Sequence, residues 1–275
     1  MAIDYSEHLD ADSLRLLAET TGYMSSAQAA QPFQSQPHDI RVALASPRAA
    51  SLLDLTEPQN PLQHRLLQLA VGVHQTAEDI CQAGWIATDQ SVIDLNLVSF
   101  SGQSRHQQFL VGLLASYLES PAPAGFDDVA NATRPCSLPR LHELIDLCAT
   151  ANVTERAGVL RLLGDEALFT SGLFPAVAHD QRVDPTLVSS LDSVLPRAVT
   201  SLMDDLKPQL KTLLDVYLMF GPIWYRMASQ DLLFSAGREP LSDIATDFAI
   251  ARRFMVQVSQ GPLEQLKYEL YPQIS

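Results

Sequence analysis

Two adjacent acidic residues, Asp165 and Glu166, are the side chains whose type and position most suggest chemistry. They lie in the strongly apolar stretch 164–175, which reads Gly-Asp-Glu-Ala-Leu-Phe-Thr-Ser-Gly-Leu-Phe-Pro. Carboxylates in such a place can serve an active site or a metal ion. They can also be structural, because a buried carboxylate requires a positive or hydrogen-bonding partner. We favour the structural role.

Arginines are the predicted partners of these two carboxylates. The candidates are Arg161, Arg226, Arg252 and Arg253. The pair at 252–253 precedes Phe254 and can alternatively meet an anion. In a chain this acidic, we expect the two arginines to form ion pairs with carboxylates of their own helix or of another helix.

Two histidines stand four residues before an acidic residue on predicted helices, so that each pair shares a helix face. These low-ranking metal candidates are His74 with Glu78 and His142 with Asp146, and both pairs can share a site with Asp165 or Glu166. The Glu-x-x-His pairs of di-iron helical bundles do not occur in the sequence. We interpret the pairs as exposed neighbours of small energetic effect and predict neither a metal nor a cofactor.

An aromatic group follows on a later predicted helix. It consists of Tyr217, Phe220, Trp224 and Tyr225, and Gly221-Pro222 interrupts it. A proline removes a backbone hydrogen bond, so this helix can bend around a pocket for an apolar ligand. Core packing is the simpler interpretation.

Signatures of common enzyme classes do not occur in the sequence. These are the Walker phosphate loop, the dinucleotide-binding glycine pattern, the G-x-S-x-G elbow and the H-E-x-x-H zinc motif. We therefore assign no catalytic residue and expect a protein that is not an enzyme.

The charge balance restricts the partners. Among 275 residues, 18 are basic and 32 acidic, which gives a net charge of −14. Nucleic-acid phosphates and anionic membranes repel such a chain on average. We expect a protein partner or a homodimer, with no nucleic acid and no membrane.

The three cysteines and the first residues indicate the compartment. Cys81, Cys136 and Cys148 are odd in number and have no C-x-x-C spacing, which favours a reducing environment. Residues 1–12 hold four acids and no base, unlike a signal peptide. The longest strongly apolar run, 216–225, is too short to span a membrane, which takes about 20 residues. We expect a cytoplasmic protein.

Helical spacing of apolar residues runs through most of the chain and predicts an all-α fold, an irregular bundle of about nine helices with little or no strand. Only residues 84–101 contain a strand-like alternation, and there we favour helix or irregular structure. The proline-rich segment between 119 and 137 divides an N-terminal helical region, 1–119, from a C-terminal bundle, 137–275, and we expect the two to pack together as one unit.

Start signals place several helices of the C-terminal bundle. They are a cap at Ser137, an opening at Thr154 and Glu155, and further starts at Asp184-Pro185, at Pro208 and at Ser242 after Pro240. The second of these helices is apolar nearly all round, with Leu162 on one of its apolar sides, so it is predicted to be central. It carries Asp165 and Glu166 inward and closes at Gly172 and Pro175.

The stretch 164–175 fits the pattern G-D-x-A-L-F-x-x-G-x-F-P. With residues 109–114 before it and 248–254 after it, the chain resembles a group of uncharacterised bacterial all-helical proteins over roughly residues 104–260. The resemblance implies an all-helical fold and an important Asp165, and it implies no reaction.

These observations lead to two expectations of function. The first is a non-enzymatic, acidic helical interaction, adaptor or assembly protein of the bacterial cytoplasm. The alternative is a helical-bundle enzyme or carrier whose internal apolar pocket binds a metal, haem or a small apolar ligand near Tyr217, Trp224, His142 and Asp165.

Overall fold

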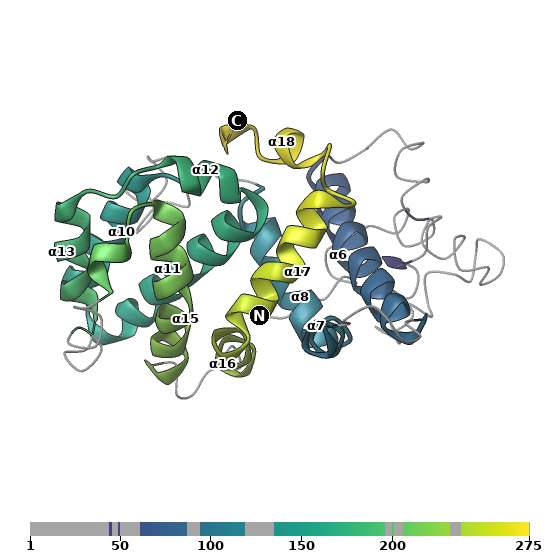
Figure 1. Ribbon diagram of the computed structural model, residues 1–275, viewed down its shortest axis with the longest axis horizontal. Helices are drawn as coiled ribbons and strands as arrows, with labels where there is room; N and C mark the ends of the chain where they lie inside the picture. Colours follow the sequence, from purple (N-terminus) through teal and green to yellow (C-terminus); the bar gives the residue numbers. More distant parts are fainter. Residues whose placement is uncertain are drawn as a thin grey trace. The chain divides into compact units, whose positions relative to one another are not determined.

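A computed structural model describes residues 44–45, 49, 61–86, 94–118, 135–195, 200, 206–231 and 238–274 (Figure 1). Every regular element in these ranges is helical, and the only β-type pairing among them is an isolated bridge between Arg182 and Thr212. The predicted all-α fold is confirmed. The proline-rich residues 119–134 lie outside the described ranges.

The chain divides into two compact units. The first unit comprises residues 1–119 and 257–270, and the second comprises residues 120–256 and 271–275. This division differs from the two predicted regions in one respect, because residues 257–270 belong with the earlier part of the chain.

The first unit is built on helix α6, which spans Pro61–Ile86 and packs against α7 (Leu95–Ser101) and α8 (Ser104–Ser116). A short helix, α18 (Lys267–Leu270), belongs to the same unit. The Asp94 side chain accepts hydrogen bonds from the backbone amides of Asn96 and Leu97, two of the free amides in the first turn of α7. The strand-like alternation therefore belongs, over residues 95–101, to a capped helix.

The second unit is arranged around α11 (Val153–Leu173), which lies beside α15 (Leu213–Asp231) and also contacts α10 (Leu138–Thr150) and α12 (Pro175–Asp180) (Figure 1). The remaining elements are α13 (Pro185–Val194), the 3-10 helices η1 (Lys207–Gln209) and η2 (Pro272–Ile274), α16 (Arg238–Thr246) and α17 (Phe248–Gln260). The boundary between the units falls within α17, after residue 256.

Helix α11 is buried along its whole second half, as its apolar composition predicts. Leu163, Ala167 and Phe169 are completely buried. Leu162 is an exception, since 42% of its surface is exposed. The apolar sides of the predicted central helix are therefore not all covered, and Leu162 is the position where the expectation of a buried central helix fails.

Two predicted helix starts are confirmed. Ser137 caps α10 by accepting a hydrogen bond from the Arg140 amide at 3.3 Å, and Asp184 caps α13 by accepting one from the Leu187 amide at 2.8 Å. Both caps follow the rule that a short polar side chain satisfies an amide two or three residues ahead.

Two other predicted starts, at Pro208 and at Ser242, are wrong, whereas the predicted opening at Thr154 and Glu155 lies within one residue of the start of α11. Helix α11 opens through a reciprocal pair in which Asn152 and Glu155 each bond the other's backbone amide. Helix α15 begins at Leu213 rather than at Pro208, because Thr212 and Asp215 form the same reciprocal pair. Ser242 lies inside α16, and α17 starts separately after Asp247.

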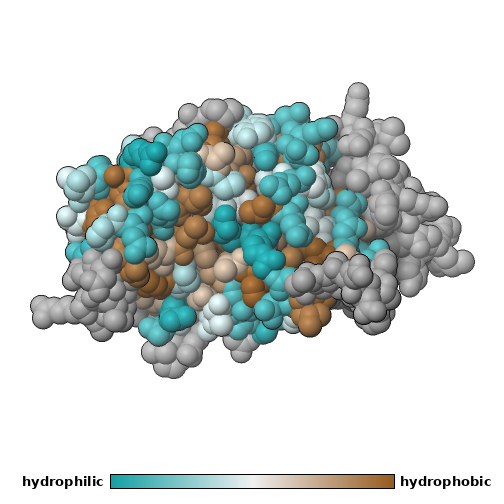
Figure 2. Space-filling view, viewed as in Figure 1, coloured by the Kyte–Doolittle hydropathy of each residue, from teal (hydrophilic) through white to brown (hydrophobic). Residues whose placement is uncertain are grey.

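None of the helices in the described ranges is long and apolar enough to cross a membrane. On the face shown in Figure 2, hydrophobic patches over the second unit are broken up by hydrophilic side chains. The large apolar side chains of the second unit with substantial exposure in its described part are Leu162 and Leu218, one on each of the two paired helices.

Candidate functional site

Helices α11 and α15 approach each other through glycines. A Cβ atom added to Gly164 would lie 2.6 Å from the Tyr225 ring, and one added to Gly221 would overlap the Phe248 ring. Gly172, which was predicted with Pro175 to close α11, lies one residue before the end of the helix at Leu173. A Cβ there would lie 2.5 Å from the Cβ of Met255. Gly164 thus sets the spacing that lets Tyr225 reach Asp165, whereas Gly172 and Gly221 allow the close approach of Met255 and Phe248 on α17.

Asp165 is bound by a tyrosine rather than mainly by an arginine. The Tyr225 hydroxyl donates to Asp165 Oδ1 at 2.7 Å, and Tyr225 is completely buried. Arg161, one turn earlier on α11, brings its Nε to 3.5 Å from Oδ2, but 39% of the Arg161 side chain is exposed. Because solvent weakens an exposed ion pair, the hydrogen bond from Tyr225 is the stronger contact.

The pKa values of this pair follow from burial. Burial raises the pKa of Asp165 above its ordinary value, and the Arg161 charge and the Tyr225 hydrogen bond oppose the rise. Burial, together with the Asp165 charge, raises the pKa of Tyr225 well above its ordinary value. Tyr225 therefore keeps its proton and remains a hydrogen-bond donor at neutral pH.

Glu166 points to a different neighbour. Only 1% of its surface is exposed, and its Oε1 accepts a hydrogen bond from the backbone amide of Cys136 at 2.6 Å. Thirty residues separate the two in the sequence, so this bond ties the segment before α10 to the middle of α11. An amide bonded to a carboxylate makes a stronger contact than one bonded to a neutral acceptor.

Cys136 occupies an unusual backbone conformation. Its φ is 59°, in the left-handed region that residues with a side chain rarely adopt. Its thiol accepts a hydrogen bond from Thr170 at 3.0 Å, and its carbonyl accepts one from Gln181 at 2.5 Å. Hydrogen bonds to its amide, its thiol and its carbonyl thus fix the position of Cys136. The next residue, Ser137, is the N-cap of α10.

Tyr217 lies beside this cluster on α15. Burial raises its pKa well above the ordinary value, the Glu166 charge raises it further, and the Thr170 hydroxyl acts in the opposite direction. Among the described residues, the Trp224 indole N–H has no hydrogen-bond partner, and the contact of the Tyr217 hydroxyl with Thr170 falls short of full hydrogen-bond geometry. Both side chains are completely buried, and Trp224 stacks on Phe220 with the ring centroids 5.7 Å apart.

Arg252 binds a backbone carbonyl of α11 rather than the carboxylates of Asp165 and Glu166. Its Nε donates to the Ser171 carbonyl at 3.2 Å, which joins α17 to the end of α11. Burial lowers the pKa of Arg252. Arg226, another predicted partner, is exposed on α15. Among the described residues, the arginine that pairs with Asp165 is Arg161.

The histidine–acid pairs are separated. His74 is buried, whereas Glu78 is exposed and accepts a hydrogen bond from Gln82. His142 pairs with Asp184, at 3.7 Å, while Asp146 is exposed. Across the described part of the chain, no three histidine, cysteine, aspartate or glutamate side chains lie close enough to hold a metal ion.

The sequence interpretation missed Cys136 and did not rank Tyr225 among the site residues. Tyr225 stands in the aromatic group beside Gly221-Pro222. The sequence signal for its role is Gly164, because a glycine next to Asp165 allows a side chain of another helix to come close. Cys136 carries no such signal, because its left-handed conformation and its bond to Glu166 arise from tertiary contacts.

The site can be tested through pH. Since the raised pKa of Asp165 means that the folded chain binds this proton more tightly than the unfolded chain, ionised Asp165 lowers the stability. The free energy of unfolding of wild type relative to Asp165→Asn is expected to fall as pH rises from the ordinary pKa of 3.8 to the raised value, and then to level off. Urea unfolding of both proteins across this range measures the difference. A difference that rises with pH would show that Arg161 and Tyr225 outweigh burial.

Comparison with family models, curated proteins and solved structures found no match for this chain.

Proposed function

We propose that this protein is a non-enzymatic interaction protein of the cytoplasm, an acidic helical adaptor or assembly component that acts by binding another protein or a second copy of itself. The observation that supports this proposal is that Asp165 and Glu166 serve as structural hydrogen-bond acceptors. Each accepts a short hydrogen bond that joins helices or segments, and the two residues are 8% and 1% exposed. An acid–base catalyst must reach its substrate.

The net charge of −14 supports the same proposal, because it disfavours nucleic acid and anionic membranes as partners. It also favours long-range attraction to a basic protein surface. The absence of the common catalytic motifs from the sequence is consistent with a binding role.

Native mass spectrometry of the full chain, tagged and purified gently from its own host, tests the proposal. We expect a discrete species heavier than the 30.2 kDa chain, either an integer multiple of that mass or the chain plus a second protein in a fixed ratio. Recovery of the chain as a lone monomer, at concentrations up to those in the cell, would contradict the proposal.

A helical carrier or enzyme is the second candidate. It is favoured by a buried polar atom on α15, Trp224 Nε1, which has no hydrogen-bond partner among the described residues and which a bound molecule can satisfy. An absorption spectrum, metal analysis and mass spectrometry of an organic extract separate the candidates. A haem band, stoichiometric metal or a retained small molecule would favour the carrier.

A further inference from the structure

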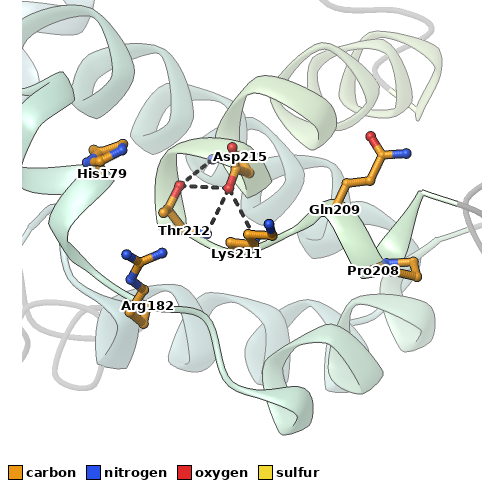
Figure 3. A pocket seen from close by; sticks show the side chains of 7 residues that line it. All are labelled: His179, Arg182, Pro208, Gln209, Lys211, Thr212 and Asp215. Carbon is orange, nitrogen blue, oxygen red and sulfur yellow. Dashed lines mark hydrogen bonds between the residues drawn. The ribbon is translucent and has the colours of Figure 1, made fainter.

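A pocket of about 400 Å³ opens in the second unit between the end of α12 and the start of α15 (Figure 3). In the view of Figure 3, Arg182 and His179 lie on one side of it, Gln209 and Pro208 on the other, and Lys211, Thr212 and Asp215 between them. The volume falls in the range of small-molecule sites.

Backbone hydrogen bonds hold the two sides of the pocket together. The Leu213 amide donates to the Gln181 carbonyl at 2.9 Å, and the Val183 amide donates to the Lys211 carbonyl at 3.1 Å. These two bonds form the isolated bridge that sets Arg182 opposite Thr212. Arg182 and Lys211 therefore lie on two separate segments of the chain, and backbone hydrogen bonds hold these segments side by side.

The charge of the lining is opposite to that of the chain. Arg182 and Lys211 are positive and Asp215 is negative, which leaves +1 with His179 not counted, against −14 for the whole chain. Within the described ranges, neither Arg182 nor Lys211 lies in an ion pair, whereas His179 pairs with Asp180 at 3.6 Å. Two exposed cations thus face the same hollow.

Asp215 is committed to capping α15. Its Oδ2 accepts hydrogen bonds from the Thr212 hydroxyl, the Thr212 amide and the Lys211 amide, at 2.8, 2.8 and 3.0 Å. Burial alone would raise the pKa of Asp215, but these hydrogen bonds and the His179 charge lower it. The Asp215 carboxylate is therefore occupied by donors at the start of α15, and the side chains of Arg182 and Lys211 remain available for a ligand.

We propose that this pocket binds a small molecule bearing an oxyanion, a phosphate or a carboxylate group. The guanidinium of Arg182 offers paired donors of the geometry that such oxygens accept, and Lys211 adds a second positive charge. The Gln209 amide supplies a neutral donor across the pocket. The proposal rests on the pocket alone and goes beyond the interaction role proposed above, since it concerns a small ligand.

Isothermal titration calorimetry of the full chain at low ionic strength tests the proposal, with pyrophosphate and citrate as the two probes. We expect at least one probe to bind with a Kd below about 1 mM, the lower end of ordinary ligand affinities. Binding of only pyrophosphate assigns phosphate chemistry, and binding of only citrate assigns carboxylate chemistry. Binding of neither probe would overturn the proposal.

Matched variants show whether binding occurs in the pocket. Arg182→Gln and Lys211→Gln are each expected to weaken binding about tenfold, because each removes a charge-assisted contact. Arg226→Gln removes the same charge from an exposed site on α15 outside the pocket lining and is expected to change the Kd less than twofold. Equal weakening by all three variants would assign the binding to general charge attraction and overturn the proposal.

Discussion

Replacing Gly164 by alanine is expected to destabilise the protein by about 2 kcal/mol. The added Cβ would lie 2.6 Å from the Tyr225 ring, far inside van der Waals contact. Overpacking a core costs about 1 to 3 kcal/mol or more, which exceeds the gain of about 1 kcal/mol that alanine brings to a helix interior. The Tyr225 ring cannot move aside freely, because its hydroxyl is bonded to Asp165.

Gly158 provides the matched control on the same helix. It is exposed, and a Cβ added there meets nothing within 4 Å. Gly158→Ala is therefore expected to stabilise the protein by up to about 1 kcal/mol through helix propensity. Urea denaturation of both variants measures the two effects. If Gly164→Ala leaves the stability unchanged, α11 and α15 do not approach each other as closely as the structure has them.

Local signals in the sequence were sufficient for the fold class and for part of the helix framework. The nearly continuous apolar character of residues 159–174 predicted a central helix, and α11 is buried accordingly. The caps at Ser137 and Asp184 were predictable because a cap depends on residues within one turn. The burial of Asp165 and Glu166 followed from their position inside that central helix.

Other features depend on contacts that no local pattern reveals. The true start of α15 rests on the reciprocal pair of Thr212 and Asp215, which Pro208 obscured as the more conspicuous helix signal. Tyr225, rather than Arg161 alone, emerged as the partner of Asp165 because Gly164 leaves room for its ring. That choice depends on how two helices, sixty residues apart, meet in space.

Replacing Glu166 by alanine is expected to have the largest effect, a loss of about 3 kcal/mol of stability. The Cys136 amide would lose its carboxylate acceptor in a buried position, which costs about 1 to 3 kcal/mol, and the truncated side chain would leave a cavity. The left-handed backbone of Cys136 would also lose one of the contacts that hold it. Glu166→Gln keeps the shape and one acceptor oxygen, so a smaller loss of about 1 kcal/mol is expected.

The free energies of unfolding of Glu166→Ala and Glu166→Gln, measured in urea beside wild type, test most directly the claim that the acidic pair of α11 is structural. Glu264→Ala, at an exposed position, serves as the control and should change the stability by less than about 0.5 kcal/mol. The account predicts a large loss for alanine and a smaller loss for glutamine. It is contradicted if both Glu166 variants are as stable as wild type or more stable, since residues kept for chemistry commonly lower the stability of the fold that carries them.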